Sequence, residues 1–290
     1  MIDHESRLQV VFADLRRAVD DVILKHKVNL PELLATIEWL EQIAGADELR
    51  ATSVLFVKTV LAANAGATYA HPEIDGASHW EMEGPAHISD APELHSPAVL
   101  PMRPDEPGEP LIVSGSVRTT TGRPLPGAVL DVWQIDADNV YSGIDASAFK
   151  LLDIPNDAAG IPTYNLRGKV ITDRDGRFEF RTMMPGIETL GFAPDGPLAG
   201  LTKALELPGL RPRHIHAMIS ADGCLPLTTQ IYFDGDPLTD AAIEGPVPAS
   251  AVKTTTLHPD PADYNAIGLD QPYRSLTYDI VLRPESGPAV

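Results

Sequence analysis

The chain contains a single cysteine, Cys224, among its 290 residues. One thiol excludes an intrachain disulfide framework, and this composition fits a reducing compartment. Because Cys224 stands in the turn-like string Ala-Asp-Gly-Cys, we do not expect it to act as a nucleophile. Long apolar runs are also absent, and the N-terminal string MIDHESRLQVVFADLRR contains no apolar signal core. We therefore expect a cytoplasmic protein that is neither exported nor membrane-spanning.

Basic side chains are few: 22 Lys and Arg stand against 41 Asp and Glu, which gives a net charge of −19. This balance disfavours nucleic acids and anionic membranes as partners and supports solubility. Proline is frequent, at 27 residues, and argues for many loops and sheet edges rather than for a helical bundle. A chain of this length can bury a sizeable core and form one large domain or two.

Residues 1–70 have the pattern of an N-terminal helical domain. Apolar residues recur mostly at spacings of three and four from Leu8 to Ile23, and Pro31 fits the first turn of a second helix. A third amphipathic stretch covers residues 47–63. Because no catalytic pattern occurs here, we interpret this domain as a dimerisation or capping unit; plain packing within the chain is the alternative.

Residues 71–109 form an irregular linker, rich in His, Pro, Glu and Gly, which we expect to contribute to a pocket. From 110 to 290 the pattern changes to short β-strands separated by Gly and Pro turns. The predicted strands cover 111–117, 128–134, 169–172, 177–181, 214–220, 227–233 and 275–282. The string Asp-Arg-Asp-Gly at 173–176 predicts a hairpin. Together these features predict a mainly β fold, an antiparallel β-sandwich preceded by the helical domain.

His214 and His216 are the most informative pair of side chains in the sequence. They stand two residues apart in the string Arg-His-Ile-His-Ala-Met-Ile, which reads as a strand. Side chains alternate along a strand, so both imidazoles lie on one face and can converge on one metal ion. Imidazole binds Zn, Fe and Cu well, whereas two unrelated histidines on a half-buried strand are the plainer interpretation.

Several longer strings occur in an informative order. They are VSGSVRTTTGRPLPGAVLDVWQIDADNVYSG, YNLRGKVITDRDGRFEFRTMMP, APDGP and RPRHIHAMISADGCLPLTTQIYFDGDP. Together they resemble the intradiol ring-cleaving dioxygenases, the group of catechol and hydroxyquinol 1,2-dioxygenases. The resemblance covers roughly residues 1–240, and its order and near-equal spacing make it more specific than any one string.

The resemblance implies a non-haem Fe(III) ion held by two tyrosines and two histidines. Tyr141 matches the first tyrosine of that pattern, and His214 and His216 match the two histidines. Phenolate and imidazole ligands suit Fe(III), although Fe(II) is also compatible. The implied reaction uses O2 to cleave a catechol-type ring between its two hydroxylated carbons, giving a muconate-type diacid. A homodimer through the N-terminal helices is implied as well.

The same resemblance assigns residues around the metal. Arg211 and Gln230 match positions close to the substrate and the iron, and Arg211 would stabilise negative charge on the substrate; a structural ion pair is the alternative role for Arg211. The expected substrate-binding residues are Arg211, Leu190, Gly84 and Pro85. Residues 143–163 are longer than the corresponding link in the family and are expected to reshape the pocket, so the substrate need not be catechol itself.

One ligand of the family pattern is missing. Counting from the histidines places Leu190 where the second tyrosine stands, and leucine neither binds a metal nor accepts a proton. A site with one anionic ligand favours Fe(III) less, so Fe(II) or Zn becomes more plausible. Alternatively, Glu188 fills the gap as ligand or base, unless it is an exposed loop carboxylate. Tyr164 is a third candidate.

Three functions are compatible with a sequence that keeps most residues of the family pattern but lacks its second tyrosine. The first is intradiol cleavage of a catechol-like aromatic. The second keeps the fold but uses a three-ligand iron site for another oxygenation or ring opening on a non-catechol aromatic. The third is an inactive β-sandwich binding protein, which the retained Tyr141, His214 and His216 argue against.

Overall fold

The computed structural model describes residues 4–46, 48, 76–81, 83–84, 86–144, 158–189, 196–204, 206, 210–240 and 247–285. The chain divides into two compact units, Met1–Leu49 and Arg50–Val290. The domain boundary predicted near residue 70 and most of the third amphipathic stretch lie outside the described residues. Both therefore stay predictions. Among the described residues, no helix has the length and apolar character needed to cross a membrane.

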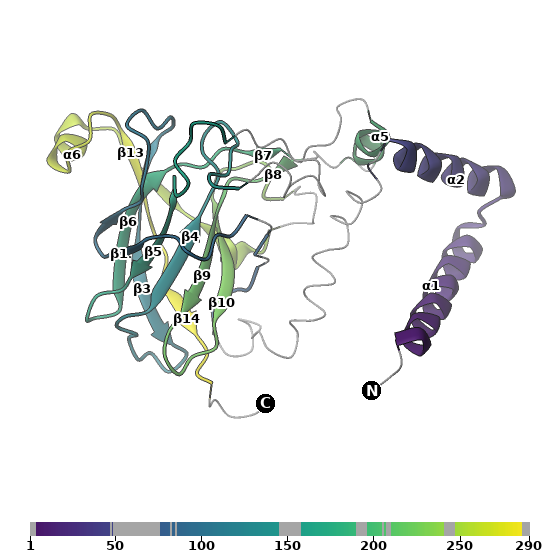
Figure 1. The fold of residues 1–290 in the computed structure, drawn as a ribbon, viewed down its shortest axis with the longest axis horizontal. Helices are drawn as coiled ribbons and strands as arrows, with labels where there is room; N and C mark the ends of the chain where they lie inside the picture. Colours follow the sequence, from purple (N-terminus) through teal and green to yellow (C-terminus); the bar gives the residue numbers. More distant parts are fainter. Residues whose placement is uncertain are drawn as a thin grey trace. The chain divides into compact units, whose positions relative to one another are not determined.

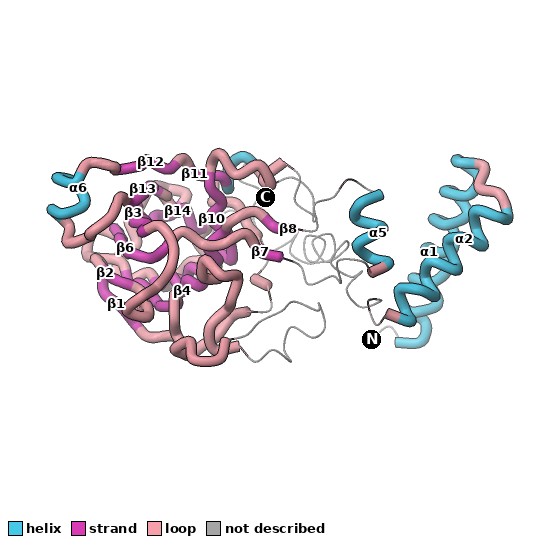
Figure 2. The backbone as a smooth tube through the Cα atoms, turned by 90° about the horizontal axis from the view of Figure 1, so that it is seen from above, coloured by secondary structure: helices cyan, strands magenta, loops and turns pink. Residues whose placement is uncertain are grey.

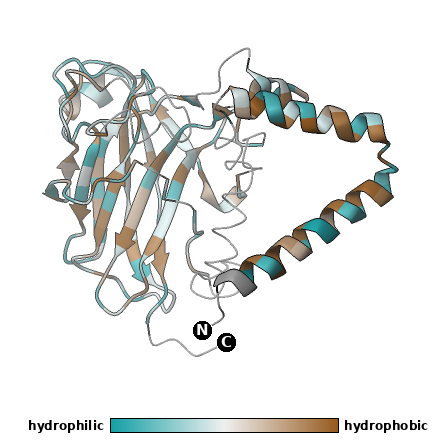
Figure 3. Ribbon diagram, turned by 45° about the vertical axis from the view of Figure 1, so that its right-hand side comes forward, coloured by the Kyte–Doolittle hydropathy of each residue, from teal (hydrophilic) through white to brown (hydrophobic). Residues whose placement is uncertain are grey.

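The first unit contains helices α1 (His4–His26) and α2 (Leu30–Gly45). Helix α2 begins with a capping box: Asn29 Oδ1 accepts from the Glu32 N–H at 3.0 Å, and the Glu32 carboxylate accepts from the Asn29 N–H at 2.9 Å. Pro31 lies in its first turn, as predicted. Both helices alternate apolar and polar stretches (Figure 3). They leave many large apolar side chains exposed: Leu8, Val11, Phe12, Leu15, Val19, Val22, Leu30, Leu33, Leu34, Ile37 and Leu40.

The second unit is built on two six-stranded sheets (Figures 1 and 2). The first sheet has the order β1 (Glu93–His95), β5 (Arg167–Ile171), β4 (Val129–Trp133), β9 (His214–Ser220), β10 (Leu227–Phe233) and β11 (Val252–Lys253). The second has the order β12 (Thr255–His258), β13 (Tyr273–Thr277), β3 (Pro110–Thr119), β6 (Arg177–Met183) and β2 (Ala98–Val99), with β14 (Ile280–Leu282) also paired to β3. The predicted mainly β sandwich with N-terminal helices is confirmed.

Two short strands, two short α-helices and one 3-10 helix complete the described elements. They are β7 (Glu188–Thr189), β8 (Leu210–Arg211), α5 (Pro197–Ala204), α6 (Pro261–Ala266) and the 3-10 helix Ala249–Ala251. Pairing is antiparallel for β4 with β5 and β9, for β9 with β10 and for β3 with β6. It is parallel where β1, β2, β11, β13 and β14 join the sheets.

The hydrophobic core lies between the two sheets. Alternate residues of each central strand point inward and are buried, as period-two patterning requires. The first sheet contributes Val132, Ile215 and Ile231, and the second contributes Val113 and Phe180. The alternating residues of β4, β9 and β10 point to the other face of the first sheet, and they include His214, His216 and Gln230.

The predicted hairpin at 173–176 is wrong. Its turn forms, since Asp173 Oδ1 accepts from the N–H groups of Asp175 at 2.9 Å and Arg177 at 2.8 Å. The flanking strands, however, belong to different sheets, because β5 pairs with β4 and β1 whereas β6 pairs with β3 and β2. Turn chemistry fixes a reversal of chain direction but does not fix which strands share hydrogen bonds. The segment is an arch between the sheets.

Two further expectations need refinement. The stretch 275–282, predicted as one strand, is two short strands, β13 and β14, and both pair in parallel with β3. The linker at 71–109 contains the short strands β1 and β2, which join opposite sheets. The linker is therefore part of the sandwich in its second half.

Candidate metal centre

His214 and His216 converge as the sequence predicts. They lie on one face of β9, and their Nε2 atoms are 3.1 Å apart. Each residue is only 2% exposed. Two buried imidazole nitrogens at this distance repel each other unless a proton or a metal cation lies between their lone pairs. The plainer interpretation, two unrelated histidines, does not explain this convergence.

Neighbouring groups fix the position of both imidazole rings. His214 Nδ1 lies 2.7 Å from the carbonyl oxygen of Pro212, which can only accept, so Nδ1 carries the proton. The ring of His216 stacks on Trp133, with centroids 4.9 Å apart and an interplanar angle of 3°. Burial, with help from the neighbouring His214, lowers the pKa of His216 well below its usual value and keeps the ring neutral. Neutral, fixed imidazoles are what a metal ion requires.

Tyr141 supplies a third donor. Its Oη lies 3.0 Å from His216 Nε2, and the residue is 3% exposed. The pKa of Tyr141 is raised well above its usual value, mainly because the hydroxyl is buried and secondly because the Glu188 carboxylate is near. The buried Arg167 lies 5.9 Å from the centroid of the tyrosine ring and opposes this increase. Burial lowers the pKa of Arg167 to about 10, which still leaves it charged at neutral pH. A bound cation would favour the phenolate further.

Two separations among these three atoms suit a shared metal ion. Metal–donor bonds of about 2.0–2.2 Å at angles of about 90–110° place two donors about 2.8–3.6 Å apart. The measured separations are 3.0 Å between Tyr141 Oη and His216 Nε2 and 3.1 Å between the two histidine Nε2 atoms. Over the ranges that the structure describes, no group of three or more His, Cys, Asp or Glu side chains could hold a metal ion. The set of Tyr141, His214 and His216 is a different kind of group, because one of its members is a tyrosine.

Arg211, Glu188 and Gln230 form a buried polar cluster beside the histidines. Strands β7 and β8 pair with Glu188 opposite Arg211, and the Arg211 Nη1 atom lies 2.5 Å from Glu188 Oε2. The same Nη1 lies 3.1 Å from His214 Nε2, and Nη2 donates to Gln230 Oε1 at 3.1 Å. Glu188 Oε2 is 3.6 Å from His214 Nε2. The description of Glu188 as an exposed loop carboxylate is wrong, because only 4% of the residue is exposed.

The remaining predicted residues are placed differently. The hydroxyl of Tyr164 donates to Asp90 at 2.9 Å in an exposed position, away from the buried donors. Leu190 and Pro85 lie outside the described residues, as does most of the 143–163 insertion. Gly84 touches the site: a Cβ built on it would lie 3.2 Å from His216 Cε1.

Sequence reasoning missed two residues of the site. Trp133 pairs with His216 across β4 and β9, and Tyr232 pairs with His214 across β10 and β9. The hydroxyl of Tyr232 donates to Gln230 Oε1 at 2.6 Å, so this amide oxygen accepts from two donors. Both residues stand at the ends of predicted strands beside predicted site residues. Only the register between strands could have singled them out.

The position of Gly84 leads to a prediction with a matched control. Gly84 and Gly268 both have φ of +76°, so alanine at either position is expected to destabilise folding by about 1–2 kcal/mol. Around Gly268, no atom of the described chain lies within 4 Å of the added Cβ, whereas the Cβ at Gly84 meets His216. Gly84→Ala should therefore also weaken metal retention about tenfold. Elemental analysis after dialysis of both variants tests this, and equal metal loss in both would contradict it.

Comparisons with known proteins place the chain among dioxygenases. The family model Dioxygenase_C, described as "Dioxygenase", matches residues 82–284. A chlorocatechol 1,2-dioxygenase of Rhodococcus opacus is 31% identical over 284 residues, which is 96% of this chain and 98% of that protein. A catechol 1,2-dioxygenase of Acinetobacter baylyi is 29% identical, covering 94% of this chain and 82% of that protein. The crystal structure of a hydroxyquinol 1,2-dioxygenase from Pseudomonas putida superposes with a TM-score of 0.76 at 26% identity, covering 98% of this chain and 94% of the other.

Proposed function

The chain belongs to the intradiol dioxygenase family, and we propose that it cleaves a catechol-type ring between its two hydroxylated carbons. Both atoms of O2 enter the product, a muconate-type diacid. The observation that carries this proposal is that Tyr141 Oη and His214 Nε2 lie 3.0 and 3.1 Å, respectively, from His216 Nε2. Catechol, chlorocatechol and hydroxyquinol 1,2-dioxygenases among the relatives support the substrate class.

We propose iron as the metal, with Fe(III) favoured and Fe(II) as the alternative. Tyr141, His214 and His216 would hold it, and the donor set of one phenol and two imidazoles suits this ion. Bound iron would supply the charge that draws both oxygens of the catechol to the site and makes its ring reactive toward O2. The missing second tyrosine leaves a single tyrosine ligand, since the position assigned to Leu190 carries no donor atom.

The side chains around the donors prepare the site for an anionic substrate. Arg211 is held at both ends of its guanidinium by Glu188 and Gln230, so its positive charge is fixed before the substrate arrives. A fixed charge in a buried site stabilises developing negative charge without reorganisation. We propose that Arg211 stabilises the substrate anion, and that Gln230, which is fully buried, sets the orientation of Arg211. Gly84 leaves room beside the His216 ring.

Glu188 is proposed as a partner of Arg211 and not as a metal ligand. Its carboxylate oxygen lies 2.5 Å from Arg211 Nη1 but 3.6 Å from His214 Nε2. A hydrogen bond with Glu188 also contributes to the raised pKa of Tyr141. The absence of a metal-binding group of His, Cys, Asp and Glu among the described residues supports the same assignment. Substrate-lining roles for Leu190 and Pro85 stay predictions.

The exposed apolar side chains of α1 and α2 support a homodimer through the N-terminal helices. A soluble helix that exposes Phe12 at 70% and Leu24 at 75% gains stability by burying that surface against a partner. We propose that this partner is a second copy of the chain. The small aromatic substrate and O2 are the other proposed partners, and the cytoplasmic location stays a prediction.

Oxygen uptake tests the proposed reaction. Iron-loaded protein is expected to consume one O2 for each molecule of catechol, chlorocatechol or hydroxyquinol, with a muconate-type diacid as product. Ultraviolet absorption and mass spectrometry identify this product by the addition of two oxygen atoms. Uptake with a non-catechol aromatic alone would favour the second function, another oxygenation at a three-ligand site. An iron-loaded protein that consumes no O2 with any of them would contradict the proposal and favour a binding protein.

A further inference from the structure

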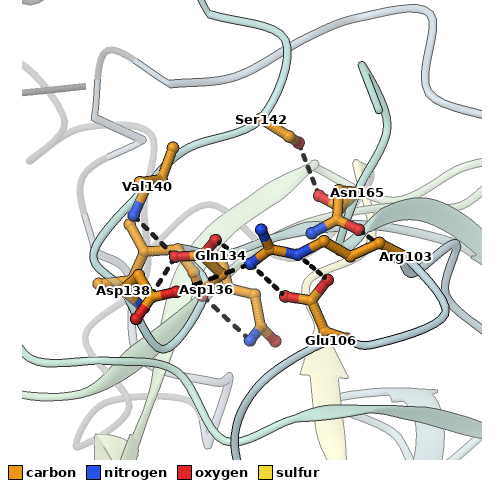
Figure 4. Close-up of polar contacts among 9 residues, drawn as sticks. Arg103, Glu106, Gln134, Asp136, Asp138, Val140, Ser142 and Asn165 are labelled. Atoms are coloured by element: carbon orange, nitrogen blue, oxygen red, sulfur yellow. Dashed lines mark hydrogen bonds and ion pairs between the residues drawn. The ribbon is translucent and has the colours of Figure 1, made fainter. Parts of the chain in front are cut away.

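A buried carboxylate holds the segment that ends at Tyr141 (Figure 4). Asp136, at 1% exposure, follows β4 and lies five residues before the tyrosine. Its Oδ1 accepts from the N–H groups of Asp138 at 2.9 Å and Val140 at 3.0 Å. Its Oδ2 accepts from Arg103 Nη2 at 2.8 Å. One side chain thus binds the backbone of the residue directly before Tyr141 and anchors it to a distant arginine.

The residue directly after Tyr141 is tied to the same arginine by a second route. The Oγ of Ser142 donates to the carbonyl oxygen of Asn165 at 2.6 Å. The side-chain oxygen of Asn165 accepts from the backbone N–H of Arg103 at 2.9 Å. The guanidinium of Arg103 is itself oriented by Glu106, whose Oε2 lies 3.1 Å from Nε. Both neighbours of Tyr141 are therefore connected to one support, as the dashed lines of Figure 4 show.

The same segment also holds the strand that carries Glu188. The N–H of Gly186 donates to the carbonyl oxygen of Asp136 at 3.1 Å, and a Cβ at position 186 would lie 2.8 Å from that oxygen. Asn139, whose φ is +70°, accepts from the N–H of Thr189 at 3.3 Å. The residues around Tyr141 and those around Glu188 consequently share one framework.

From these contacts we propose that Asp136 is a positioning residue for the Tyr141 ligand. Three hydrogen bonds to its carboxylate, one of them from a guanidinium, fix the backbone on which the tyrosine stands. A metal ligand has to be held within about 0.5 Å of its productive position, and this precision requires rigid support from neighbouring residues. This inference rests on the proposed function, in which Tyr141 binds the iron.

The test compares Asp136→Asn with Asp138→Asn in the iron-loaded protein. Asparagine at 136 removes the charge that Arg103 binds and turns one acceptor into a donor. Asp138 is the matched control, because its side chain is 71% exposed and its carboxylate is 3.9 Å from the same arginine. The readout is the visible absorption band of a tyrosinate bound to Fe(III), measured per bound iron, since overall stability does not move this band.

We expect Asp136→Asn to bind iron through the histidines but to show at least a twofold weaker or a clearly shifted band. Turnover should decrease about tenfold or more, as displaced reactive groups usually cause. Asp138→Asn should match the unmodified protein. If Asp136→Asn does not fold, Arg103→Gln removes the same ion pair and should change the band in the same direction. An unchanged band per iron in the folded variant overturns the inference.

Failure of this inference and failure of the proposed site can be told apart. If the unmodified iron-loaded protein has no such band, or if Tyr141→Phe retains it, Tyr141 is not the ligand and both ideas fall. If the band is present, is lost in Tyr141→Phe and is unchanged in Asp136→Asn, the ligand assignment stands and only the positioning role is wrong.

Discussion

His214→Ala is expected to abolish most iron binding. Its Nε2 is one of the three proposed donor atoms, and its loss leaves a phenol and a single imidazole 3.0 Å apart, too few protein donors for a stable site. We expect the affinity to fall by more than about 100-fold, because outer partners of metal ligands alone typically change it 10- to 100-fold. Elemental analysis after dialysis against a weak chelator measures this directly.

The matched control is His26→Ala. His26 is the exposed last residue of α1 and has no place in the proposed site, so this variant should bind iron as the unmodified protein does. Circular dichroism of His214→Ala should show that the sheets still form, because β9 pairs with β4 and β10 through backbone hydrogen bonds that the substitution leaves in place. Full iron retention in a folded His214→Ala protein would remove this histidine from the ligand set.

Arg211→Ala is expected to have the second large effect, on both catalysis and stability. Loss of a fixed charge that faces the developing negative charge lowers kcat about 100- to 1,000-fold. The variant also leaves the Glu188 carboxylate, only 4% exposed, without the partner that lies 2.5 Å away. Breaking a buried pair in this way typically costs about 3–5 kcal/mol of folding free energy. Oxygen-uptake kinetics and urea denaturation measure the two effects.

A double variant separates these two roles of Arg211. Adding Glu188→Gln to Arg211→Ala removes the unpaired buried charge, so most of the lost stability should return. Turnover should stay low, because the positive charge beside His214 is still missing. Iron content should stay near that of the unmodified protein in both variants. Restored turnover in the double variant would show that Arg211 is a structural ion pair only.

The sequence predicts the centre of the site better than its surroundings. The common face of His214 and His216 follows from the alternation of side chains along a strand, which depends on local backbone geometry alone. The burial of Glu188 does not follow, because it arises when β7 pairs with β8 and brings Arg211 opposite. The same limit explains the arch at 173–176, where a correct turn joins strands of different sheets.

The support of Tyr141 shows the same limit over a longer range. Asp136 and Arg103 are 33 residues apart in the chain, and neither stands in a pattern that points to the other. Trp133 reaches His216 only through the register of β4 with β9. The spacing of apolar residues and the turn residues determine where strands and helices form and which of their faces are buried. Which side chains meet between strands or sheets is set by the packing of the whole domain.

The most direct measurement is a titration of metal-free protein with ferric iron, followed by visible absorption. We expect a tyrosinate-to-iron band that grows with added iron and saturates at one ion per chain, because we assign Tyr141, His214 and His216 to a single ion. Saturation at one iron per chain without any visible band would mean that no phenolate binds the ion. That result would contradict the account at its centre.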